Sequence, residues 1–148
     1  MWGKFLSPKD IEGGRVTNQQ RLPVSEQVSP QETAILVVED DQEIGRLLVQ
    51  VLANETPYQV LLALDALQAL ETVKTQTPRL LILDYFLPGM NGIALYDRLH
   101  SMHTLSNVPA LIMSASLPWR DIQQRHLAYL SKPFELDELL QIVDELLG

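Results

Sequence analysis

Short, wholly apolar runs alternate with amphipathic stretches along most of this chain, and that alternation limits the possible folds more than any other feature. Runs that are apolar on both faces fit strands covered on both sides, as in parallel sheets. Strands that alternate with helices predict a doubly wound α/β sheet, because right-handed crossovers place helices on both faces. Four clear runs and a weaker fifth span residues 34–38, 58–62, 80–83, 110–113 and 128–131.

The segments between these runs repeat their apolar residues at helical spacing, which predicts a helix after each strand. The fourth of these segments is the poorest, with only Trp119, Ile122 and Leu127 as candidates for a buried stripe. The five expected helical stretches span residues 44–52, 67–73, 93–99, 118–127 and 136–147.

Residues 1–32 differ from the rest, with three prolines, a Gly13-Gly14 pair and no apolar period. We interpret them as a disordered tail and residues 33–148 as one domain. The alternative is a docking segment that uses Trp2, Phe5 and Leu6. The tail is favoured, because three apolar residues offset little of the entropy lost on ordering a segment.

Composition excludes several classes of function. The 148 residues contain no cysteine, so disulfides and thiolate metal sites are excluded. The sequence contains neither an apolar run of about 18 residues nor a signal-peptide pattern, so we expect a cytoplasmic protein without membrane contact. The net charge is -8 and the basic residues are scattered, so direct binding to nucleic acid is not expected.

Polar residues follow the predicted strands at the point where each strand ends. Glu39, Asp40 and Asp41 follow the first strand, and Asp84 follows the third. The fourth strand ends at Ser114 and the fifth is followed by Lys132. Because the carboxyl ends of parallel strands lie together, we expect these side chains to converge.

Such a cluster suits the handling of a phosphoryl group. Neighbouring carboxylates repel one another unless a cation joins them, and Mg²⁺ prefers oxygen ligands. Asp84 could form an aspartyl phosphate, whose negative charge Lys132 and Mg²⁺ would offset. Ser114 could donate a hydrogen bond to a phosphoryl oxygen. Taken singly, each residue is more commonly structural, and Asp41 is expected to be the N-cap of the first helix; the coincidence at four strand ends favours the shared site.

Four motifs together resemble the receiver domains of bacterial two-component response regulators, and the resemblance covers residues 33–148. It implies a flavodoxin-like strand order of 2-1-3-4-5. The motifs are Ile35-Leu36-Val37-Val38-Glu39-Asp40-Asp41, Leu83-Asp84-Tyr85-Phe86-Leu87-Pro88-Gly89-Met90-Asn91-Gly92, Ile112-Met113-Ser114-Ala115 and Tyr129-Leu130-Ser131-Lys132-Pro133-Phe134.

The resemblance implies a role for each site residue. Asp84 would be the phosphoacceptor. Glu39 and Asp40 would hold Mg²⁺ together with Asp84 and the backbone carbonyl of Phe86. Lys132 would contact the phosphoryl group.

The resemblance also implies a switch. Ser114 would move toward the phosphoryl group, and Tyr129 would swing inward into the space that Ser114 leaves. The Lys132-Pro133 peptide would be cis. The output surface would be the face made by the fourth helix, the fifth strand and the fifth helix.

The chain departs from the family pattern in the fourth helix and in the pair of residues before Tyr129. The spacing from Ser114 to Lys132 is about one helical turn short, so we expect a short fourth helix. The residues before Tyr129 are Leu127 and Ala128 instead of a pair of small residues. Phe86 is large and apolar where the family controls water access, which leads us to hypothesise slow self-dephosphorylation.

Three functions remain in competition. The first is a signalling switch without other enzymatic activity, which receives its phosphoryl group from a sensor histidine kinase or phosphotransfer protein and acts on a protein target or a second copy. The second is a pseudo-receiver that binds proteins without phosphorylation. The third, a Mg²⁺-dependent phosphotransfer enzyme, is disfavoured because no substrate pocket is evident. His100 and His103 are spaced to share a metal on the third helix, but no third ligand is evident.

Overall fold

The computed structural model describes residues 34–148, where five parallel strands form one sheet in the order β2-β1-β3-β4-β5. The prediction of a flavodoxin-like α/β fold is confirmed. The expected disordered tail at residues 1–32 and its alternative, the docking segment, lie outside the described residues. The strands are β1 (Ala34–Val38), β2 (Gln59–Ala63), β3 (Pro78–Asp84), β4 (Ala110–Ser114) and β5 (Ala128–Ser131).

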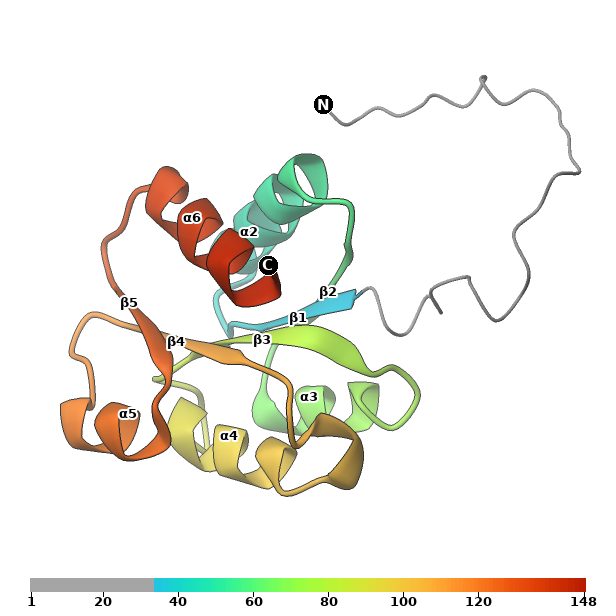
Figure 1. The fold of residues 1–148 in the computed structure, drawn as a ribbon, viewed down its shortest axis with the longest axis vertical. Helices are drawn as coiled ribbons and strands as arrows, with labels where there is room; N and C mark the ends of the chain where they lie inside the picture. Colours follow the sequence, from blue (N-terminus) through green and yellow to red (C-terminus); the bar gives the residue numbers. More distant parts are fainter. Residues whose placement is uncertain (1–33) are drawn as a thin grey trace, which may run out of the picture.

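Five α-helices of residues 34–148 cover both faces of the sheet, with two on one face and three on the other (Figure 1). The pair is α2 (Gln42–Glu55) and α6 (Leu136–Leu147). The other three are α3 (Ala66–Thr72), α4 (Gly92–His100) and α5 (Trp119–Arg125), and a 3₁₀ helix, η3 (His103–Leu105), follows α4. Asp41 is the N-cap of α2, as predicted, and its carboxylate accepts hydrogen bonds from the backbone N–H groups of Glu43 and Ile44.

The apolar runs form two cores because successive residues of a strand point to opposite faces. In β1, Ile35 and Val37 pack into the core beneath α2 and α6, whereas Leu36 and Val38 pack beneath α3, α4 and α5. All four side chains are fully buried. Burial of each stabilises the fold by about 1.5–3 kcal/mol, which explains why this run is apolar without alternation.

Helix α5 has only seven residues, which confirms the predicted short fourth helix. A helix this short needs tertiary contacts to persist. Within α5, the side chain of Ile122 is buried. The guanidinium of Arg125 forms a bidentate ion pair with the carboxylate of Asp97 on α4, with hydrogen bonds of 2.8 and 2.9 Å. Arg125 also contacts the Asp121 carboxylate at 3.1 Å. The helix ends at His126, which has a left-handed backbone with φ 54°.

The predicted placement of His100 and His103 on one helix is wrong. Helix α4 ends at His100, and His103 begins η3. The imidazole of His100 stacks on the ring of Tyr96, with 4.9 Å between ring centroids. Neither histidine joins the acidic group of residues 34–148 that could hold a metal ion. In the same range, no helix is both long enough and apolar enough to span a bilayer.

Candidate functional site

Three carboxylates meet where the strands end, as the sequence predicts. Glu39 directly follows β1, and its backbone N–H donates to the carbonyl of Ala63 on β2 at 3.0 Å, which fixes its direction. Asp84 is the last residue of β3. Glu39 and Asp84 are 1% and 5% exposed, whereas Asp40 is exposed. One carboxylate oxygen from each acid lies within 4.8 Å of the other two.

Lys132 joins the two buried acids. Its Nζ donates to Oε1 of Glu39 and to Oδ1 of Asp84, each at 3.1 Å. The backbone is fixed as well, because the N–H of Lys132 donates to the carbonyl of Ser114 at 2.9 Å. The Lys132-Pro133 peptide is cis, as the resemblance implied. The structure therefore brings one cation, directly after β5, onto two carboxylates, one directly after β1 and one at the end of β3.

The electrostatics of the site leave negative charge in excess. Burial raises the pKa of Glu39, and the negative charge of Asp84 raises it further. The hydrogen bond from the N–H of Asp41 and the ammonium of Lys132 lower it, but the net pKa of Glu39 is still raised. For Lys132, burial lowers the pKa, but hydrogen bonds to Asp84 and Glu39 outweigh it and the net pKa is raised. One ammonium thus faces three carboxyl groups, so a further cation would be bound favourably.

The donor set fits a hard divalent cation. Carboxylate oxygens are the ligands that Mg²⁺ prefers, and Glu39, Asp40 and Asp84 supply one oxygen each within a small space. The loop after β3 offers a backbone carbonyl as well. The carbonyl of Tyr85 accepts from the N–H of Leu87 and of Gly92, whereas the neighbouring carbonyl of Phe86 accepts no hydrogen bond from residues 34–148. The role of Phe86 as a ligand stays a prediction.

Ser114 and Tyr129 lie apart from the carboxylates. The hydroxyl of Ser114 is buried, donates to the carbonyl of Ser116 at 2.8 Å and accepts from the N–H of Ser116 at 3.1 Å. Tyr129 is 46% exposed, and its ring stands edge-on to that of Trp119 on α5, with 4.8 Å between centroids. Both side chains therefore have other partners than the acidic cluster.

Gly92 is a site residue that the sequence reasoning missed. It is the first residue of α4, and a Cβ atom there would lie 2.5 Å from the backbone carbonyl oxygen of Asp84. Only glycine permits this approach of α4 to the strand end. The Asn91-Gly92 pair just before an apolar helical stripe was the available signal, because Asn91 is the N-cap of that helix.

Comparison with known proteins gives a single family. The model of the response regulator receiver domain matches residues 35–144. Sporulation initiation phosphotransferase F of Bacillus subtilis is 34% identical over 117 residues, which cover 76% of this chain and 92% of that protein. Hybrid signal transduction histidine kinase D of Dictyostelium discoideum is 31% identical over 117 residues, and the match spans only 7% of that much longer protein.

Solved structures agree with this result. The receiver domain of a sensor histidine kinase from Pseudomonas aeruginosa PAO1, determined with a magnesium ion coordinated in its active-site cleft, has a TM-score of 0.69 and 26% identity. The match covers 79% of this chain and 98% of that one. A receiver domain protein from Methanospirillum hungatei JF-1 has a TM-score of 0.71 at 25% identity and covers 78% of this chain and 94% of its own.

Proposed function

This chain belongs to the response regulator receiver domain family, and we propose that it is a phosphorylation-dependent signalling switch that accepts a phosphoryl group on Asp84. One observation carries the proposal. The carboxylate of Asp84 is buried at the end of β3, is held by Lys132 and lies beside Glu39 and Asp40. Burying two acids around one lysine costs stability, so the arrangement is better explained by chemistry than by packing.

The proposed reaction is transfer of a phosphoryl group from a phosphohistidine to a carboxylate oxygen of Asp84. The new O–P bond forms as the N–P bond of the donor breaks, and the bonding pair stays on the donor imidazole. The ammonium of Lys132, already 3.1 Å from Asp84, offsets charge on the transferred group. Mg²⁺ held by Glu39, Asp40 and Asp84, with the Phe86 carbonyl, would supply further charge neutralisation when bound.

Phosphorylation would act on two side chains that the resting structure holds elsewhere. To donate to a phosphoryl oxygen, the hydroxyl of Ser114 must give up the hydrogen bond that it donates to the carbonyl of Ser116. Its departure opens a space beside β4, into which Tyr129 turns from its exposed position against Trp119. The affected surface is the face of α5, β5 and α6, which we propose as the output surface.

The proposed partners follow from this mechanism. A sensor histidine kinase or a phosphotransfer protein supplies the phosphoryl group, and a protein target or a second copy reads the output surface. Direct contact with nucleic acid or membrane is not proposed, because the net charge is -8. We further propose a cytoplasmic location and no enzymatic activity beyond the protein's own phosphorylation and dephosphorylation.

The test is a phosphorylation assay read by intact mass. The protein is incubated with Mg²⁺ and acetyl phosphate, and we expect one phosphate adduct that Asp84→Ala abolishes and omission of Mg²⁺ suppresses. Asp137→Asn is the matched control, because Asp137 is an exposed acid on α6. It should gain the adduct as the unaltered protein does.

The same assay decides between the switch and the pseudo-receiver. The short helix α5 leaves room for the latter, because α5 is the element expected to respond to phosphorylation. If the folded protein gains no adduct from acetyl phosphate or from a phosphorylated histidine kinase, the switch is refuted and the pseudo-receiver is supported. An adduct that persists in Asp84→Ala would refute the assignment of the phosphoacceptor.

A further inference from the structure

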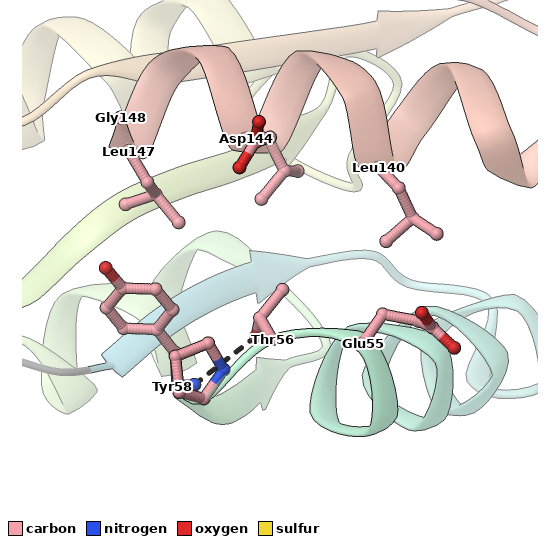
Figure 2. Close-up of a pocket in the computed structure, with 9 residues that line it drawn as sticks. Glu55, Thr56, Tyr58, Leu140, Asp144, Leu147 and Gly148 are labelled. Atoms are coloured by element: carbon pink, nitrogen blue, oxygen red, sulfur yellow. Dashed lines mark hydrogen bonds between the residues drawn. The ribbon is translucent and has the colours of Figure 1, made fainter. Parts of the chain in front are cut away.

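A cavity of about 470 Å³ lies between the end of α2 and the end of α6, far along the strands from Asp84. Its walls are apolar, with Leu140, Val143 and Leu147 on α6 and the ring of Tyr58 in the loop before β2. Figure 2 shows Leu140 and Leu147 pointing from α6 toward that loop, with the Tyr58 ring rising toward Leu147. The size and lining match those of sites that bind a few apolar groups.

The cavity wall is fixed by its own hydrogen bonds. The hydroxyl of Thr56 donates to the carbonyl of Leu52 at 2.7 Å. It also accepts from the N–H of Tyr58 at 3.3 Å (Figure 2). The guanidinium of Arg79 lies over the Tyr58 ring, 5.9 Å from its centroid. The cavity therefore exists before any occupant arrives, which lowers the ordering cost of binding.

The rim of the cavity is acidic. Glu55 at the end of α2 and Asp144 on α6 both line it and both are exposed. Neither carboxylate forms a salt bridge with another of residues 34–148. An occupant that pairs apolar side chains with positive charge would therefore match both the walls and the rim.

The described chain begins beside this cavity. Ala34, the first residue of β1, is paired with Gln59 of β2, and Gln59 follows Tyr58 directly. Neighbouring strands lie about 4.8 Å apart, so residues 1–33 join the domain one strand spacing from the cavity wall. The first nine of these residues contain Trp2, Phe5 and Leu6 together with Lys4 and Lys9.

We propose that residues 2–9 of this chain occupy the cavity, with the apolar side chains against α6 and the lysines at the acidic rim. The chain between Lys9 and Ala34 has about 25 residues and can reach roughly 80 Å, so it does not limit access. Tethering gives an effective concentration on the order of millimolar, so even weak affinity suffices. This interaction is independent of phosphorylation of Asp84.

A spin label on the cavity rim tests the proposal in the full-length protein. The chain has no cysteine, so Asn54→Cys on α2 gives a single labelling site beside Glu55. Gln124→Cys on α5, on the opposite face of the sheet, is the matched control. We expect the label at position 54 to cause loss of the amide signals of Trp2, Phe5 and Leu6, and the label at position 124 to leave them.

Charge reversal tests the recognition. Glu55→Lys with Asp144→Lys should restore the lost signals, and adding Lys4→Glu with Lys9→Glu should remove them again. Glu55 and Asp144 are exposed, so their substitution leaves both cores intact. A mixed sample separates docking within one chain from docking between two copies. It combines spin-labelled protein without isotopes and isotope-labelled protein without a spin label, so only docking between two copies can cause signal loss in it. Equal signals with both labels, signal loss in the mixed sample, or a charge reversal that fails to restore the signals would overturn the proposal.

Discussion

Replacing Gly92 with alanine should damage the phosphoacceptor segment far more than the same replacement at Gly45. At Gly92 the new Cβ atom would lie 2.5 Å from the carbonyl oxygen of Asp84 and 3.0 Å from the Cα atom of Tyr85. Carbon and oxygen atoms in close contact are normally about 3.3 Å apart or more, so the two segments must separate by roughly 0.8 Å. Both contacts are backbone atoms and cannot rotate away.

The magnitude follows from what has to move. Overpacking of this kind costs about 1–3 kcal/mol of unfolding free energy. Displacing a reacting group by about 1 Å can cost on the order of a hundredfold in rate, so phosphorylation of Asp84 should slow by a similar factor. Gly45 lies inside α2, where the nearest atoms to a new Cβ belong to the Leu62 side chain, with its two methyl carbons at 2.9 and 3.0 Å. That flexible side chain can shift, and alanine gains about 1 kcal/mol of helix propensity, so the net change should stay within about 1 kcal/mol.

Urea unfolding measures the free energy of unfolding of each variant. The rate of adduct formation from acetyl phosphate with Mg²⁺ measures the rate of Asp84 phosphorylation. The expected result is a lower urea midpoint and a much slower rate for Gly92→Ala, with both values near those of the unaltered protein for Gly45→Ala. If Gly92→Ala unfolds at the unaltered midpoint and gains the adduct at the unaltered rate, the reasoning from backbone contact is refuted.

Three further predictions concern side chains. A double-mutant cycle of Arg125→Ala and Asp97→Asn should give a coupling of about 0.5–1 kcal/mol at pH 7. The hydrogen bond from Arg125 lowers the pKa of Asp97, so this stability is present above the unfolded value of 3.8 and is lost as pH falls through the lower folded pKa. A coupling that does not decline as pH is lowered below 3.8 would contradict this. Lys132→Met should cost about 3 kcal/mol in urea unfolding without Mg²⁺, because two buried carboxylates lose their cation, and added Mg²⁺ should recover part of the loss. Phe86→Asn should shorten the phosphoryl half-life if the exposed Phe86 ring shields the acyl phosphate, and an unchanged half-life in a phosphate-release assay would contradict it.

The sheet, its strand order and the acidic cluster were predictable because they depend on local patterns and on fold-wide rules. A run such as residues 34–38 is apolar on both faces only where helices cover both sides, and parallel topology then brings Glu39, Asp84 and Lys132 together. The residues at which helices end were less predictable. Helix α4 stops at His100 without glycine or proline, and the hydroxyl of Ser101 bonds the carbonyl of Arg98 at 2.7 Å instead.

The remaining features depend on contacts that no local pattern encodes. Arg125 and Asp97 lie 28 positions apart, and their pairing follows from how α5 packs against α4. The orientation of Ser114 depends on a turn that its own hydroxyl closes with Ser116. The requirement for glycine at position 92 appears only when α4 is placed against the end of β3.

The two contacts at the ends of α5 determine how a change at Ser114 could reach the surface. At its start, Trp119 holds Tyr129 only through an edge-on ring contact of about 1 kcal/mol. At its end, Arg125 is fixed to α4 by two short hydrogen bonds to Asp97. If Ser114 leaves Ser116 as proposed, the displacement would enter α5 at its weakly held start, while the anchored end would resist translation. We infer that α5 pivots about Arg125, so a short helix still changes the direction of Trp119 and the surface that a partner meets.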